Sequence, residues 1–232
     1  MPIKIEYFSD VLCIWAYAGQ VRMDELKQHF ADEIEIDYRF VSIFGAGRQH
    51  VETVWKEQGG LAGFNAHLLQ VAKNWDHVEV SPDLWLTVQP QSSTAAHLYL
   101  KAIQLLEKRS PDYCEPLAEF NGRTRFEQAT WLFRDAFFRE GRDVSHRKVQ
   151  QEITQQLDLD LKPICELIES GEAFAELHAD DKARHDYNVP GSPTLVLNEG
   201  RQMLYGNVGY RIIDANIREL IRNPDEGEAS WC

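Results

Sequence analysis

The chain has 232 residues, a length that fits one large domain or a domain with a sizeable insertion. Apolar residues make up 44% and charged residues 26%, which is ordinary for a folded soluble protein. The formal net charge of −13 argues against a nucleic-acid backbone or an anionic membrane surface as a partner, because both require a basic protein surface.

The first forty residues predict a strand, a helix and a second strand. Ile3–Phe8 is rich in β-forming residues and alternates in polarity, which indicates a buried strand. A helix is expected from about Ile14 to Phe30, and Ile34–Phe40 alternates cleanly as a second strand. Strand, helix and strand together form a βαβ unit with parallel strands and a right-handed crossover.

The middle of the chain carries helical periodicity interrupted by proline and glycine. Gly45–Gly63 is glycine-rich, and we expect a loop there. The best-supported helices are 92–108, 125–139, 145–157 and 161–169, and short helices are expected to lead to Asp181–Tyr187.

The C-terminal part predicts an antiparallel hairpin followed by a helix. Two short strands, Thr194–Leu197 and Gln202–Tyr205, flank a turn, and a helix is expected from about Ile212 to Ile221. The element order predicts an α/β fold in which a helical insertion splits a thioredoxin-like core into βαβ and ββα halves. We assign residues 1–45 and 182–223 to the core, 46–181 to the insertion and 224–232 to a mobile tail.

Cys13 is the most informative residue of the sequence. It lies where the first strand ends and the first helix should begin, facing the positive end of the helix dipole and several unpaired N–H groups. This position favours the thiolate, so we expect Cys13 to be a nucleophile with a pKa below that of a free cysteine. The alternative is a buried, inert cysteine that acts as a small apolar side chain. In the usual redox motif, Cys-x-x-Cys, the fourth position holds a second cysteine, whereas this chain has Ala16.

Four segments, spread over roughly residues 3 to 222, together resemble the cytoplasmic branch of the DsbA-like thioredoxin superfamily. That branch includes FrnE-type dithiol oxidoreductases, 2-hydroxychromene-2-carboxylate isomerases and kappa-class glutathione transferases. FrnE-like members typically read Cys-Pro-Trp-Cys, where this chain has Ile14 for the proline and Ala16 for the second cysteine. The segments that carry the resemblance are Ile3–Phe8, Cys13–Tyr17, Arg134–Glu140 and the Gly-Ser-Pro-Thr run 191–194.

The resemblance implies a cis bond between Ser192 and Pro193, held against the Cys13 turn. Proline is unusual at the start of an interior strand because it lacks the N–H, and an ordinary trans proline before an edge strand is the alternative. A cis turn would leave the backbone groups of Ser192 free to pair with an incoming thiol-bearing peptide. We therefore predict Cys13 as the catalytic residue and Trp15, Ser192 and Pro193 as the substrate-binding residues.

Several other residues have an ordinary structural interpretation. His97, near the start of a predicted helix, is expected to be a packed helical histidine, and Ser92 or Ser93 to be the N-cap of that helix. Trp75 and Trp85 are candidates for an apolar ligand pocket. We expect Cys165 on a buried helix face, Cys114 in a loop and Cys232 in the tail. No group of residues has metal-ligand spacing, so we expect no metal.

Thiol–disulfide chemistry by a monothiol is the leading functional hypothesis. Cys13 would attack a disulfide or form a mixed disulfide with glutathione, and an external thiol would release it. The first alternative is a glutathione-dependent isomerase or transferase, although the Ser-Asp pair that holds glutathione in that branch is missing from Gly206–Arg211. The second is a non-catalytic thioredoxin-fold protein that binds a partner. We expect no bound cofactor, with glutathione as a candidate co-substrate.

The sequence predicts a cytoplasmic location. Met1 to Lys4 run straight into the first strand without the apolar segment of a signal peptide, and no apolar run approaches the length of a bilayer span. The four cysteines form no close pair and hence no disulfide framework. The expected partners are a thiol or disulfide substrate, either protein or small molecule, without nucleic acid or membrane.

Overall fold

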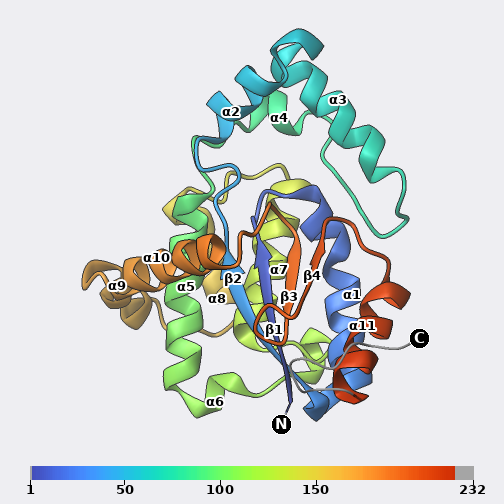
Figure 1. Cartoon of the computed structure of the whole chain (residues 1–232). Helices are drawn as coiled ribbons and strands as arrows, with labels where there is room; N and C mark the ends of the chain where they lie inside the picture. Colours follow the sequence, from blue (N-terminus) through green and yellow to red (C-terminus); the bar gives the residue numbers. More distant parts are fainter. Residues whose placement is uncertain (1, 223–232) are drawn as a thin grey trace.

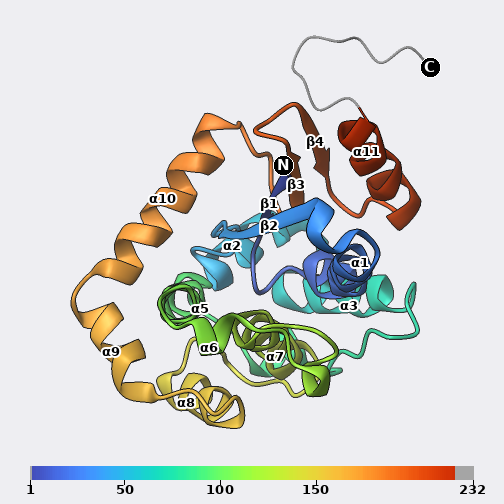
Figure 2. The same ribbon diagram turned by 90° about the horizontal axis from the view of Figure 1, so that it is seen from below.

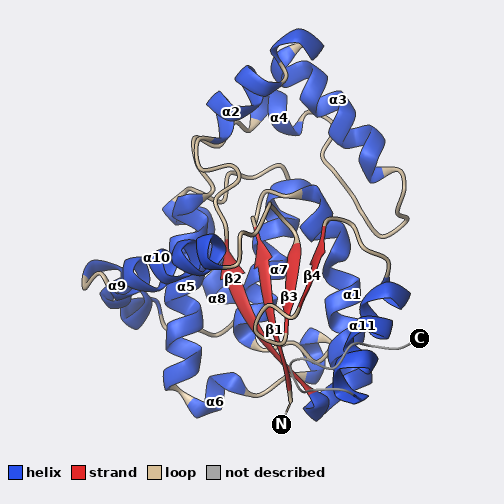
Figure 3. Ribbon diagram, in the orientation of Figure 1, coloured by secondary structure: helices blue, strands red, loops and turns tan. Residues whose placement is uncertain are grey.

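A four-stranded mixed sheet organises the computed structural model, which describes residues 2–222. The strand order is β2-β1-β3-β4; β1 and β2 run parallel, whereas β3 is antiparallel to both β1 and β4 (Figure 3). The strands span β1 Ile3–Ser9, β2 Ile34–Phe40, β3 Thr194–Leu197 and β4 Gln202–Tyr205. The predicted βαβ unit and C-terminal hairpin are therefore confirmed.

The buried face of the sheet is set by strand alternation. Ile5 and Tyr7 point to the same face as their register partners Leu197 and Leu195, and all four are buried. Helices α1 (Ile14–Phe30) and α11 (Tyr210–Arg222) supply the apolar side chains that cover this face (Figure 2).

The remaining helices lie between β2 and β3 in the sequence. Helix α5 packs against α7, α9 and α10, and α10 also contacts β2. Figure 1 shows α2, α3 and α4 grouped beyond the end of the sheet at which β1 runs into α1. The α-helices of this region are α2 Gly47–Val54, α3 Gly60–Ala72, α4 Leu84–Thr87, α5 Thr94–Arg109, α6 Pro111–Cys114, α7 Arg125–Phe138, α8 Arg147–Gln156, α9 Leu161–Glu169 and α10 Glu172–Asp186.

A buried ion pair joins two of these helices to the sheet. Lys101 of α5 lies 2.7 Å from Asp180 of α10, and the same carboxylate accepts the backbone N–H of Phe40 at the end of β2. Both side chains are almost completely buried, so each needs the other. This pair fixes α10, and therefore the chain that leads into β3, against β2.

Two predictions about the middle of the chain are wrong. The segment 45–63 contains α2 and the start of α3 rather than a loop, because its glycines mark a helix end and a close backbone approach and do not form a flexible run. The short helices expected before Tyr187 are one continuous helix, α10, which ends at Asp186. The boundary placed at 181/182 thus lies inside a helix, whereas the division into core and insertion stays a prediction. The tail 224–232, with Cys232, lies outside the described residues.

Candidate active site around Cys13

Cys13 lies in a tight turn between β1 and α1. It is the N-cap residue of α1, with the extended backbone of that position, as the sequence predicts. Asp10 builds the turn: its Oδ1 accepts the N–H of Leu12 at 2.9 Å, and its carbonyl accepts the N–H of Cys13 at 3.1 Å. The chain therefore turns from β1 into α1 within four residues, 10–13, and places the thiol at the N-terminus of the helix.

Asp10 also ties this turn to two distant segments. Its Oδ2 accepts the N–H of Phe44 at 2.8 Å and the hydroxyl of Ser93 at 2.9 Å. Its own N–H donates to Ser192 Oγ at 2.8 Å. Ser93 occupies the N-cap position of α5, but its hydroxyl is committed to Asp10 and does not cap the helix. The position of Cys13 is thus fixed from three sides.

Cys13 and Ser192 meet as the resemblance implies. The Ser192–Pro193 peptide bond is cis, and the Cys13 thiol donates to the Ser192 carbonyl with Sγ and O 3.3 Å apart. The expectation that this carbonyl is free is therefore wrong. Within residues 2–222, the N–H of Ser192 donates to no backbone carbonyl.

The expectation of a lowered pKa at Cys13 is contradicted. Cys13 is only 6% exposed, and burial raises the pKa of its thiol. Hydrogen bonds from Ser192 and from the N–H of Ala16 favour the thiolate and limit the rise, while the negative charge of Asp10 adds to it. The sequence argument used the helix N-terminus and had no measure of burial.

A buried histidine supports the turn from the other side. His97 is fully buried, stacks on Phe40, and its Nε2 accepts the N–H of Val11 at 3.0 Å. This bond places the proton of the neutral ring on Nδ1, which lies 3.4 Å from Ser42 Oγ. Nε2 is also 3.4 Å from Asp10 Oδ1. The packed histidine predicted from the sequence therefore holds the Cys13 turn.

Hydrogen bonding decides the charge of the Asp10 carboxyl. Although burial opposes ionisation, the N–H groups of Phe44 and Leu12 donate to the carboxylate and lower the pKa of Asp10 below its usual range. Asp10 is therefore a carboxylate at neutral pH.

Trp15 contacts the connection between α3 and α4. Its ring lies edge-to-face on Trp75, with centroids 5.5 Å apart, and His77 Nε2 lies 3.0 Å from the carbonyl of Ala18 in α1. These contacts hold residues 75–77 against the first turns of α1. Trp85, by contrast, is fully buried among Phe44, Phe64 and Phe137, so it belongs to the core rather than to a pocket.

The other described cysteines lie apart from this site. Cys114 is exposed at the end of the short helix α6 rather than in the predicted loop, and its thiol donates to the carbonyl of Glu107. Cys165 is half-buried on α9, not fully buried as predicted. Within residues 2–222, no group of three or more His, Cys, Asp or Glu side chains could hold a metal ion.

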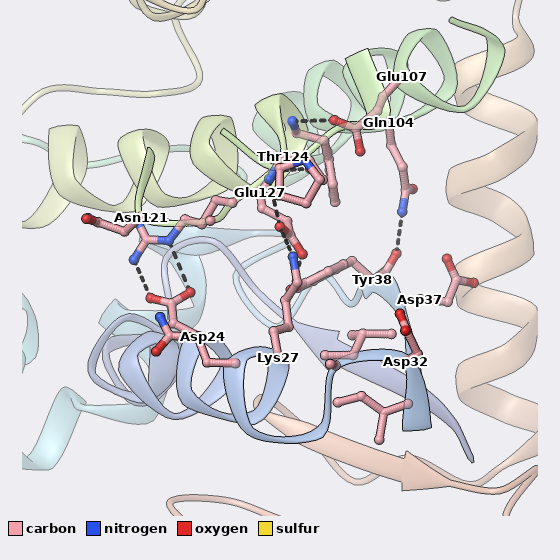
Figure 4. Close-up of a pocket in the computed structure, with 18 of the residues that line it drawn as sticks. Asp24, Lys27, Asp32, Asp37, Tyr38, Gln104, Glu107, Asn121, Thr124 and Glu127 are labelled. Atoms are coloured by element: carbon pink, nitrogen blue, oxygen red, sulfur yellow. Dashed lines mark hydrogen bonds and ion pairs between the residues drawn. The ribbon is translucent and has the colours of Figure 1, made fainter. Parts of the chain in front are cut away.

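A separate cavity of about 450 Å³ lies at the other end of α1 (Figure 4). Lys27, which lines it, is fourteen residues beyond Cys13 in one helix, about 20 Å away at the α-helical rise. Two ion pairs lie along this cavity, Lys27 with Glu127 and Arg123 with Asp24. This cavity is therefore not part of the thiol site.

The chain belongs to the family of the DSBA-like thioredoxin domain, whose model matches residues 4–218. No curated protein sequence matches the chain. Among the described residues, no helix has both the length and the apolar character required to cross a membrane.

Solved structures share this fold at low sequence identity. A probable DsbA oxidoreductase from Streptomyces coelicolor is 17% identical, with a TM-score of 0.69 over 99% of this chain and 94% of that one. The cytosolic disulfide reductase DsbM from Pseudomonas aeruginosa is 15% identical, with a TM-score of 0.63 over 93% and 99%. A 2-hydroxychromene-2-carboxylate isomerase is 16% identical, with a TM-score of 0.60 over 95% and 97%.

Proposed function

We propose that this protein catalyses thiol–disulfide exchange as a monothiol, with Cys13 as the nucleophile and Trp15, Ser192 and Pro193 as the substrate site. The observation that carries the proposal is the meeting of the Cys13 thiol with the Ser192 carbonyl across 179 residues of sequence. An arrangement that serves only packing does not need a sulfur at a helix N-terminus beside the Ser192 N–H, which donates to no backbone carbonyl within residues 2–222.

The exchange proceeds in two balanced steps. The Cys13 thiolate attacks one sulfur of a disulfide, a new S–S bond forms at Cys13, and the other sulfur leaves as a thiolate that takes up the proton released by Cys13. The thiolate of a second, external thiol then attacks the substrate sulfur of the mixed disulfide; a disulfide forms between these two sulfurs, and Cys13 leaves as a thiolate that can take up the proton of the external thiol. Ala16 has no sulfur, so the mixed disulfide has no resolving thiol at the usual position of the motif.

Glutathione fits the role of the external thiol. The disulfide reductase DsbM has a structure with glutathione, at a TM-score of 0.65 and 15% identity to this chain. Glutathione-dependent isomerisation is the second candidate, favoured by the likeness to the isomerase, but Gly206–Arg211 lacks the Ser-Asp anchor of that branch. We further propose a reducing cytoplasm as the site of action, where such a thiol is abundant.

Treatment with glutathione disulfide, followed by mass spectrometry of the intact and digested protein, tests the proposal. We expect one glutathione adduct on Cys13, formed faster as the pH rises because burial raises the pKa of Cys13. The Cys13→Ser variant should lose this adduct, whereas Cys114→Ser, at an exposed thiol, should keep it. An unmodified Cys13 in a protein whose Cys114 reacts would favour the non-catalytic binding protein.

Ala16→Cys tests the monothiol part separately. It restores the Cys-x-x-Cys spacing at the first turn of α1, so the second thiol can resolve the mixed disulfide within one molecule. We expect insulin reduction to rise about tenfold or more over the parent protein. If insulin reduction does not rise although a thiol reagent reacts with both Cys13 and the new cysteine in the folded protein, the result contradicts a site that carries out disulfide exchange.

A further inference from the structure

Arg134 is a fully buried arginine that has only neutral partners. It lies on α7 with its side chain 0% exposed. Nη1 donates to Gln20 Oε1 at 2.6 Å and Nη2 donates to Ser9 Oγ at 2.9 Å. Its Nε has no partner among the described residues. A buried guanidinium in this setting has given up water without gaining a carboxylate.

Several other buried charges within residues 2–222 have an ion-pair partner. Lys101 faces Asp180 at 2.7 Å, and Arg123 forms an ion pair with Asp24. No carboxylate within residues 2–222 forms such a pair with Arg134, so its guanidinium has no ion-pair partner. Burial of a charge without an ion-pair partner destabilises a fold.

The partners of Arg134 lead directly to Cys13. Ser9 is the last residue of β1 and precedes Asp10, which builds the Cys13 turn. Gln20 belongs to α1, the helix that Cys13 caps. Tyr7 of β1 is buried as well: burial raises the pKa of its hydroxyl, the charge and hydrogen bonding of Arg134 lower it, and the charge of Cys13 raises it.

The titratable and charged groups around Cys13 come from each neighbouring element. Asp10 is the negative member, and its charge disfavours the thiolate. Of the positive side chains, Arg22 lies on the partly exposed side of α1, whereas Arg134 is enclosed and hence little screened by water. The titratable and charged groups on the elements that pack around the turn include Tyr7 of β1, Asp10 of the turn, Arg22 of α1, His77 of the α3–α4 connection, His97 of α5, and Arg134 and Asp135 of α7.

We propose that Arg134 is a positioning residue of the thiol site, whose buried charge offsets Asp10 and favours the ionised form of Cys13 while its fork joins β1 to α1. The inference rests on the proposed function, since it concerns the reactivity of the same thiol. This effect on the ionisation of Cys13 requires the positive charge of Arg134, and an apolar side chain of equal size would not produce it.

The ionisation of Cys13 in variants of Arg134 provides the test. It is followed by the pH dependence of iodoacetamide labelling at Cys13, with Cys13→Ser as the blank. Arg134→Met keeps the volume and removes the charge, so we expect the midpoint to rise by about 0.5 pH unit or more, a roughly threefold loss of thiolate. Arg134→Lys keeps the charge and should restore the midpoint to within about 0.2 of the parent value.

A second pair of variants keeps the test valid if Arg134→Met does not fold. Gln20→Glu neutralises Arg134 in place, and we expect the midpoint to rise in the same direction. Gln104→Glu is the matched control, because Gln104 is also a buried amide that accepts from a cation, Lys101, and donates to a neighbour. It lies toward the far end of α5, beside the cavity of Figure 4, and should leave the midpoint unchanged.

An unchanged midpoint in both Arg134→Met and Gln20→Glu would overturn the proposal, as would an equal rise in Arg134→Met and Arg134→Lys, which indicates a purely structural role. Labelling by iodoacetamide does not require disulfide exchange. A failure of the glutathione reaction and a failure of this inference are therefore distinguishable.

Discussion

Asp10 shows how much one carboxylate can organise around a single thiol. It accepts hydrogen bonds from its own turn, from the segment after β2 and from the start of α5, and its N–H reaches Ser192. The same charge disfavours the Cys13 thiolate. The residue that positions the thiol therefore also limits its reactivity.

Unlike Asp10, the side chain of Ser192 favours the Cys13 thiolate, so its removal should slow the reaction of Cys13 with iodoacetamide. Its side chain accepts the N–H of Asp10 and, by hydrogen bonding, lowers the pKa of Cys13. We expect Ser192→Ala to raise this pKa further and to slow iodoacetamide labelling at neutral pH by about threefold. Ser170→Ala, which removes a hydroxyl at the end of α9, is the control. A faster reaction of Cys13 in Ser192→Ala would contradict this role.

At the scale of elements, glycine patterning misled the sequence interpretation around α3. Gly59 has a left-handed backbone with φ of 96° and precedes the helix, whereas Gly63 lies inside it. A Cβ at Gly63 would stand 1.8 Å from the carbonyl oxygen of Gln58. The glycines therefore permit a close approach between η2 (Lys56–Gln58) and α3 rather than a flexible loop.

Gly63→Ala should accordingly destabilise the α2–α4 region. The added methyl group forces the backbone at Gln58 to move, and we expect a loss of about 1 to 3 kcal/mol in the free energy of unfolding. Urea unfolding followed by tryptophan fluorescence reports it, since Trp55 and Trp85 lie in this region. Gly209→Ala, where a Cβ meets no atom within 4 Å, is the control. Equal stability of the two variants would contradict the close approach of Gly63 to the carbonyl of Gln58.

At the scale of the whole molecule, buried charges join segments that are distant in sequence. Lys101 and Asp180 hold α5, α10 and β2 together, and Arg134 links α7 with β1 and α1. Glu107 of α5 accepts the N–H of Phe126 at the start of α7, in the region of the cavity of Figure 4. Burial raises the pKa of this carboxyl to about 7.

Glu107 should therefore make stability depend on pH. The folded carboxyl holds its proton more tightly than the unfolded one, so this contribution to stability is present below pH 4.5 and is lost as the pH rises to about 7. Glu107→Gln mimics the protonated form and should be more stable than the parent by about 1 to 2 kcal/mol near pH 8, allowing for partial exposure, and about equal near pH 5.

Urea unfolding at the two pH values measures this difference. Glu119→Gln removes the same charge at an exposed position and should change the free energy of unfolding by less than about 0.5 kcal/mol at both. If the stability of Glu107→Gln relative to the parent protein does not increase from pH 5 to pH 8, the raised pKa of Glu107 is refuted.

The sequence by itself determined the elements that local patterning encodes. β1, α1, β2 and the C-terminal hairpin follow from periodicity, and the position of Cys13 at a helix N-terminus follows from their boundaries. The approach of Ser192–Pro193 to Cys13 came from the family resemblance, because two short motifs mark one site of one fold.

Only the tertiary structure decided the chemistry of the thiol. The pKa of Cys13 depends on its burial and on charges brought in from other elements, and neither can be read from the residues beside it in sequence. His97 and Arg134 lie 84 and 121 positions beyond Cys13, in helices whose own patterns indicate only packing. Electrostatic interactions depend on distance in space and on exclusion of water, so the fold had to place these side chains before their effect on Cys13 could be stated.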